Sequence, residues 1–195
     1  MADLESLPST FSAGEARARG VHPRELYEWR DSGEVIELSR GTFRKADAPQ
    51  ASFPDLLAVA HRAPRAIVCC VSAAAVYDLT DEQPVEVQIA VPNRTHPPRI
   101  DYPPTKVFRF DPDTFELGLE RLEAAPGEWV RVYDAARTVT DLMRLRHRFG
   151  DPHALGALNR YLDLPGARPA LLLRYAKALD VLGPMRHAVD VATAR

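Results

Sequence analysis

Glycine and proline divide the first 45 residues into short segments, and this punctuation constrains the fold more than any other feature. Ser12 is suited to cap a helix that Gly20 ends, because its hydroxyl accepts from free amides and glycine adopts the left-handed conformation without strain. Pro23 suits the first turn of a second helix, where no amide hydrogen is needed, and Gly33 closes that helix. The pattern predicts two short helices joined by a tight turn.

A hairpin is expected after these helices. Residues 34–40 and 42–45 read as two short strands that flank a single glycine. In the second helix, Leu26, Trp29 and the stem of Arg30 fall on one inward face. Helix, tight turn, helix and hairpin is the order of a winged helix-turn-helix, which we therefore predict for the N-terminal part of the chain.

The stretch over residues 46–54 is small, polar and marked by two prolines, which is typical of a linker. We place a domain boundary there, with the winged helix over residues 1–48 and a larger domain over residues 49–195. Because few contacts are expected to cross such a linker, each part is expected to fold alone.

The larger part changes from strand-like to helical patterning. Seven prolines lie between Pro84 and Pro112, so this window holds only short strands and turns. Half-buried strands are expected over residues 85–91, 105–110 and 129–133, and helical periodicity begins at Ala135. The predicted fold class is α+β: an N-terminal winged helix-turn-helix followed by a larger mixed α+β domain with a helical C-terminal cluster.

The composition is that of a globular protein without a basic field. The 195 residues carry 25 lysines and arginines against 27 acids, for a net charge of −2, so any nucleic acid must bind a local patch. No apolar run reaches the roughly 18 residues of a membrane span, and the N-terminus lacks the apolar core of a secretory signal. Cys69 and Cys70 are adjacent and are expected to be small buried side chains. A cytoplasmic location without membrane contact is expected.

Enzymatic interpretations are less favoured. Asp78 or Asp81, followed by Glu86 and Gln88, is similar to the carboxylates of a metal-dependent nuclease, but Gln88 stands where such sites carry a lysine. Strand alternation already explains Glu86 and Gln88 as the polar face of their strand. Ser72 lacks the sequence context of a hydrolase nucleophile and is expected to cap the following helix. The histidines show no ligand spacing, so neither a metal nor a cofactor is expected.

Several phrases of the chain resemble the AbiEi antitoxin family. They span most of residues 11–162 and are Phe11–Val21, Asp31–Val35, Arg40–Phe43, Ser72–Val76, Glu86–Pro92 and Val132–Leu142. The last of these, Val132–Leu142, is the most specific. The resemblance implies a non-enzymatic antitoxin of a type IV toxin–antitoxin system, whose partner toxin is a nucleotidyltransferase encoded alongside. It further implies that the winged helix represses the shared operon by binding operator DNA, and that the C-terminal domain counters the toxin.

Helix order and resemblance together indicate which side chains meet DNA. In a helix-turn-helix the N-terminal end of the second helix enters the major groove, where arginine pairs with guanine and glutamate with cytosine. Basic side chains around it contact phosphates. We predict base contacts by His22, Arg24, Glu25 and Tyr27, and phosphate contacts by Arg17, Arg19, Arg40, Arg44 and Lys45. The alternative is that these are solvated charges on a protein-binding winged helix.

Two alternatives stay open in the larger part. Arg137 and Asp141 are four residues apart, which favours an intrahelical pair, or a cap at Asp134 with Arg137 on the helix surface, over a toxin contact. At the level of function, a stand-alone winged-helix transcriptional regulator, whose larger domain senses a ligand or dimerises, is the chief alternative to the antitoxin. The toxin-binding residues and the oligomeric state are left open by the sequence.

Overall fold

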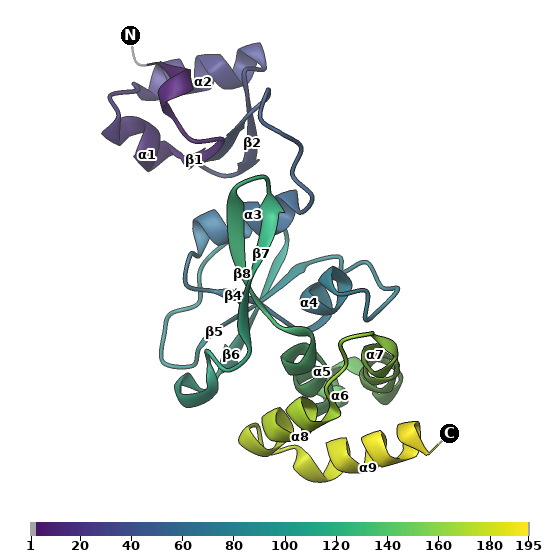
Figure 1. The fold of residues 1–195 in the computed structure, drawn as a ribbon. Coiled ribbons are helices and arrows are strands. Elements are labelled where there is room, and N and C mark those ends of the chain that lie inside the picture. Colours follow the sequence, from purple (N-terminus) through teal and green to yellow (C-terminus); the bar gives the residue numbers. More distant parts are fainter. Residues whose placement is uncertain (1–2, 195) are drawn as a thin grey trace. The chain divides into compact units, whose positions relative to one another are not determined.

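The computed structural model describes residues 3–194, which form two compact units (Figure 1). Unit 1 comprises the chain up to Arg65 together with Pro98–Thr105 and Leu122–Val130. Unit 2 comprises Ala66–Pro97, Lys106–Arg121 and the chain from Arg131 onward. The predicted boundary after residue 48 concerns independent folding and stays a prediction.

Unit 1 begins with the elements of a winged helix. In chain order these are η1 (Leu4–Ser6), β1 (Thr10–Ser12), α1 (Ala13–Ala18), α2 (Pro23–Ser32), β2 (Val35–Ser39) and β3 (Thr42–Lys45). The three strands form an antiparallel sheet in the order β1-β3-β2, so β3 is central and paired on both edges. The predicted helices and hairpin are confirmed, whereas β1 was not expected.

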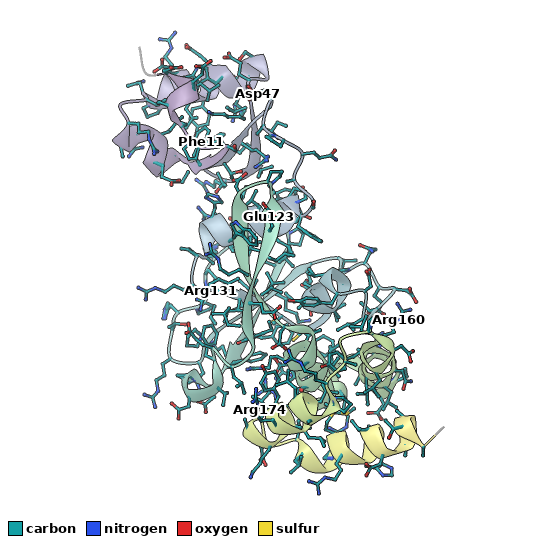
Figure 2. All side chains as sticks on the ribbon, in the orientation of Figure 1. Phe11, Asp47, Glu123, Arg131, Arg160 and Arg174 are labelled. Atoms are coloured by element: carbon teal, nitrogen blue, oxygen red, sulfur yellow. The ribbon has the colours of Figure 1, made fainter. Side chains whose placement is uncertain are left out.

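Local signals explain where the two helices begin and end. Ser12 and Glu15 form a reciprocal capping box at the start of α1, and Pro23 occupies the first turn of α2. Gly33 closes α2 with a left-handed φ of 83°, a conformation that favours glycine. Phe11 and Phe43 stack in the core of the unit with ring centroids 6.1 Å apart (Figure 2 labels Phe11).

Segments distant in sequence complete unit 1. Helix α3 (Pro54–Arg62) packs on β2 and β3, and the amide of Phe53 donates to the carbonyl oxygen of Ala124 at 3.1 Å. The loop Pro98–Thr105 is joined to the hairpin by a bond of 2.5 Å from the Ser39 hydroxyl to the carbonyl oxygen of Tyr102. The winged helix is therefore extended by α3 and by two later segments of the chain.

The second sheet is mixed. It contains β4 (Ile67–Val68), β5 (Val87–Pro92), β6 (Thr105–Phe110), β7 (Leu119–Ala125) and β8 (Glu128–Tyr133), in the order β6-β5-β4-β8-β7. Strand β4 runs antiparallel to β5 and parallel to β8. A half-buried strand over 85–91 was predicted, but β5 is an interior strand that is buried along nearly its whole length, and α4 (Cys70–Val76) packs on it. Residues 119–125 and the short β4 had not been predicted as strands.

Helix α4 packs on β5 of this sheet, and the helices from α5 onward form the C-terminal cluster that was predicted (Figure 1). Helix α5 packs on α4, α7, α8 and α9. The helices and a short 3-10 turn are η2 (Pro112–Thr114), α4 (Cys70–Val76), α5 (Ala135–Arg144), α6 (Arg146–Phe149), α7 (Asp151–Asp163), α8 (Pro169–Ala178) and α9 (Leu182–Thr193). None of the helices within residues 3–194 is long and apolar enough to cross a bilayer.

At the start of α4 one side chain, Ser72, differs from expectation, and the two cysteines agree with it. Ser72 was expected to be an N-cap, but Cys69 holds that position and Ser72 lies inside the helix, where its hydroxyl accepts from the amide of Gln88 at 2.9 Å. Cys69 and Cys70 are buried free thiols, as expected, and burial raises the pKa of Cys69. A thiol held protonated in an apolar interior is a packing group.

Helix α5 carries an ion cluster in the core of unit 2. The Nε of Arg137 donates to Asp141 at 2.9 Å, and both side chains are 0% exposed. Arg144 donates to the other oxygen of Asp141 at 2.8 Å, and Asp134 caps the helix through the amide of Arg137. Burial raises the pKa of Asp141 against the opposing effect of the two guanidiniums. The intrahelical pair and the cap are confirmed, but Arg137 is interior, not on the surface.

Candidate nucleic-acid interface

Helix α2 presents one solvent-exposed face. Leu26 points into the core of unit 1, and Arg24, Tyr27 and Arg30 recur at helical spacing on another side. The Tyr27 ring is 48% exposed, and the guanidinium of Arg30 lies over it at 4.8 Å from the ring centroid. Arg30 also donates to Asp31 and Glu37. The guanidinium of Arg30 therefore supports an exposed aromatic ring, and the inward stem stays a prediction.

Arg24 is the cation best placed on this face. Its Nε lies 3.0 Å from Glu28, and the two side chains are 84% and 63% exposed. A pair this exposed contributes little free energy, so a competing anion can replace Glu28. His22 caps the helix, because its Nδ1 accepts from the Arg24 amide at 3.2 Å. That bond turns one edge of the imidazole toward the backbone, which limits the base contact predicted for His22.

Three of the predicted phosphate contacts are accessible. Arg17 and Arg19 lie at the C-terminal end of α1, and Arg40 lies in the turn between β2 and β3. Within the described chain none of the three pairs with a carboxylate. An exposed guanidinium without a carboxylate partner is suited to a phosphate.

Arg44 requires a correction. It was predicted to contact phosphate from the wing, but it is only 5% exposed. Its guanidinium donates to the Thr10 hydroxyl, to the carbonyl oxygen of Pro49 and to the carboxylate of Glu128. Because β3 is the central strand, Arg44 is enclosed by its neighbours and serves to hold unit 1 together. The predicted phosphate contact of Arg44 is therefore wrong.

Two other predicted residues lie on an acidic side of unit 1. The Nζ of Lys45 donates to the carbonyl oxygen of Glu5 at 3.2 Å, and Glu25 is half-buried beside Trp29. Two adjoining surface depressions share Leu4 and Glu34 in their lining. The carboxylates that line them are Asp3, Glu5, Glu25, Glu28, Glu34 and Asp47. Phosphate is repelled there, so the side of α2 that carries Arg24 and Tyr27 is the one compatible with DNA.

The residues of the nuclease alternative are engaged separately in unit 2. Glu86 pairs with Lys106 at 3.2 Å, and Asp81 pairs with Arg160. Gln88 is buried, and its Oε1 accepts from the amide of Val71 at 2.9 Å. Across residues 3–194, no group of three or more histidine, cysteine, aspartate or glutamate side chains converges to hold a metal ion.

Residues outside the predicted set also reach the wing. Arg62, at the end of α3, donates to the carbonyl oxygens of Arg40 and Arg99 at 3.2 and 3.5 Å. These arginines lie 22 and 37 residues from Arg62, so their proximity leaves no periodic signal in the sequence.

Comparison with known proteins identifies a family for the N-terminal segment. Residues 1–44 match the family described as "Transcriptional regulator, AbiEi antitoxin", which confirms the resemblance for this segment. The crystal structure of the RV2827C protein from Mycobacterium tuberculosis is similar, with a TM-score of 0.59 at 15% identity over 94% of this chain and 76% of that chain. At this identity the likeness concerns the fold alone. No curated protein matches the chain.

Proposed function

We propose that this protein is a DNA-binding antitoxin that represses its own operon. One observation carries the proposal: the segment that matches the AbiEi family, residues 1–44, coincides with the winged helix formed by η1 to β3, Leu4–Lys45. A transcriptional regulator acts on the chromosome, so we place its action in the cytoplasm.

In the proposed complex α2 enters the major groove by its N-terminal end. Arg24 exchanges Glu28 for the O6 and N7 atoms of a guanine, and Tyr27, supported by Arg30, contacts a neighbouring base edge. Arg17, Arg19 and Arg40 contact phosphates around this site. Glu25 and Lys45 are peripheral, since they lie on the acidic side.

Unit 2 is proposed to counter the toxin, for which a co-encoded nucleotidyltransferase is the expected partner. No catalytic role is assigned to unit 2 in this proposal. Two acids of the nuclease alternative have ordinary structural partners, Lys106 for Glu86 and Arg160 for Asp81.

DNA binding is tested by the anisotropy of a labelled duplex that contains the region upstream of the gene, measured in rising salt. We expect Arg24→Gln to cost about 1–3 kcal/mol of binding free energy and to relax preference at one base pair. Glu28→Gln is the matched control, because it frees Arg24 and removes a negative charge. It should bind DNA at least as tightly as the wild type. Absence of wild-type binding at low salt refutes the DNA-binding proposal.

The antitoxin role is tested by co-expression with the neighbouring gene while growth and promoter activity are scored. We expect growth rescue to survive Arg24→Gln and promoter repression to be lost. Repression without any rescue would favour the stand-alone regulator.

The non-enzymatic assignment has its own test. Purified protein with Mg²⁺ or Mn²⁺ is expected to leave plasmid DNA and RNA intact. Cleavage that Glu86→Ala abolishes would favour the nuclease alternative.

A further inference from the structure

Three arginines from separate segments meet beside the wing of unit 1. Arg40 comes from the β2–β3 turn, Arg62 from the end of α3, and Arg99 from the loop Pro98–Thr105; we call them the wing–loop cluster. Arg62 joins them, since its two Nη atoms donate to the carbonyl oxygens of Arg40 and Arg99 at 3.2 and 3.5 Å. The bond between Ser39 and Tyr102 holds the same loop against the same hairpin.

The cluster carries more positive charge than its surroundings neutralise. Among the residues described, neither Arg40 nor Arg62 pairs with a carboxylate. Arg99 has one loose partner, Asp101 at 3.8 Å, and its own side chain is 94% exposed. Three guanidiniums against this single aspartate leave a net charge of about +2 on an otherwise slightly acidic protein.

Two acids of unit 1 that lie near the wing bond to groups other than these three arginines. Glu37 accepts from the amide of Gly41 at 3.0 Å and from Arg30 at 3.4 Å. Glu15 accepts from the amide and the hydroxyl of Ser12 in the capping box. The cluster therefore presents Arg40 and Arg99 to solvent, with Arg62 as the residue that positions them.

We infer that the wing–loop cluster is a second phosphodiester-binding site, so that the DNA-contacting surface extends beyond the winged helix to α3 and the loop Pro98–Thr105. Arginine suits this task, because its planar fork binds two phosphate oxygens at once. Arg40 is then the shared edge of the two sites, since the turn that carries it belongs to the wing and its carbonyl oxygen receives the Arg62 bond. The inference rests on the proposed function and adds contacts that no residue of the segment 1–44 supplies.

The test is the slope of log binding constant against log salt concentration, measured with the full chain on the upstream duplex. Each phosphate contact contributes about 0.9 to this slope in duplex DNA. We expect Arg99→Gln to lower the slope by about 0.9 and to weaken binding to every sequence alike. Arg186→Gln is the matched control, because it removes the same charge from an exposed position on α9 in unit 2.

Arg62 supplies the second pair of variants. Arg62→Gln should reduce the salt slope, because the loop Pro98–Thr105 loses its bond to Arg62. Arg62→Lys should reduce the slope less, because the positive charge remains. Thermal melting of each variant separates loss of contact from loss of fold. If the wild type binds DNA and Arg99→Gln matches Arg186→Gln in slope, the inference is wrong while the proposed function stands. If the wild type binds no DNA, both are wrong.

Discussion

Helices α2 and α5 use the same sequence device in opposite environments. Each has ten residues and an arginine four positions before an acid, Arg24 and Glu28 in α2, Arg137 and Asp141 in α5. The α2 pair is mostly exposed, at 84% and 63%, whereas the α5 pair is wholly buried. An exposed pair is replaceable and leaves its arginine available to an external anion, while a buried pair is a fixed part of the core. The spacing of four residues predicts the ion pair, and burial decides whether its arginine can bind an external anion.

The largest expected effect comes from breaking the buried pair. We expect Asp141→Ala to destabilise the protein by about 3–5 kcal/mol, because Arg137 is left charged in an interior that excludes water. Glu28→Ala, the equivalent change in α2, should cost less than about 0.5 kcal/mol. Urea unfolding followed by circular dichroism measures both. If both variants lose the same free energy of unfolding, burial does not explain the difference between the two ion pairs.

A second effect concerns the only arginine of the predicted interface that proved to be interior, Arg44. Glu128→Ala should destabilise unit 1 by about 2–3 kcal/mol, because the side chains of Arg44 and Glu128 are 7% and 18% exposed. Both tryptophans, Trp29 and Trp129, lie in unit 1, so their fluorescence during urea unfolding reports on this unit. Glu5→Ala, an exposed carboxylate of the same unit, is the control.

The contacts of Arg44 also sharpen the question of where unit 1 ends. A fragment of residues 1–48 lacks Pro49 and Glu128, two of the three partners of Arg44. We expect this fragment to melt well below unit 1 in the full chain. Equal melting temperatures would support the boundary after residue 48.

Helix caps test the same comparison at lower energy. Asp134 accepts from the amide of Arg137 at 2.6 Å and from the hydroxyl of Tyr175 at 2.9 Å, so Asp134→Ala should cost about 1–2 kcal/mol. His22→Ala removes the cap of α2, which rests on one exposed bond of 3.2 Å, and should cost about 0.5 kcal/mol. The midpoints of urea unfolding give both values, provided that the dependence of the unfolding free energy on urea concentration is the same in all variants. If His22→Ala lowers the free energy of unfolding by much more than this, α2 is not held mainly by the packing of its own Leu26 in the core of unit 1.

The smallest effect is a pH dependence at the capping box. The hydrogen bond from the Ser12 amide holds the pKa of Glu15 below its ordinary value of 4.5. A lowered pKa in the folded state stabilises the protein above pH 4.5, and this contribution is lost as the pH falls through the folded value. Glu15→Gln should therefore lower stability at neutral pH by less than about 1 kcal/mol and flatten the acid side of the stability curve. A parallel downward shift at every pH would point to packing instead.

The prediction for Arg44 failed because β1 was missed. A hairpin of two strands leaves one edge of each strand unpaired, and Arg44 was predicted to contact phosphate from such a wing. Strand β1 has three residues, and its last one, Ser12, is also a helix cap, so no alternation signal remained to reveal it. Its pairing with β3 places Thr10 opposite Arg44 and encloses the guanidinium. The half-buried strand predicted over 85–91 failed because α4 packs on β5, and Gln88 bonds to Val71 and Ser72 of that helix.

The sequence by itself determined the helices of the winged unit, their caps at Ser12 and Gly33, and the pairing of Arg137 with Asp141. Each of these depends on partners within a few residues along the chain, where spacing alone sets the geometry. Only the tertiary structure decided that Arg44 is interior, and that Arg62 joins the wing to the loop Pro98–Thr105. Those contacts join residues up to 84 positions apart, and burial at that range follows from strand order and packing, which no local pattern records.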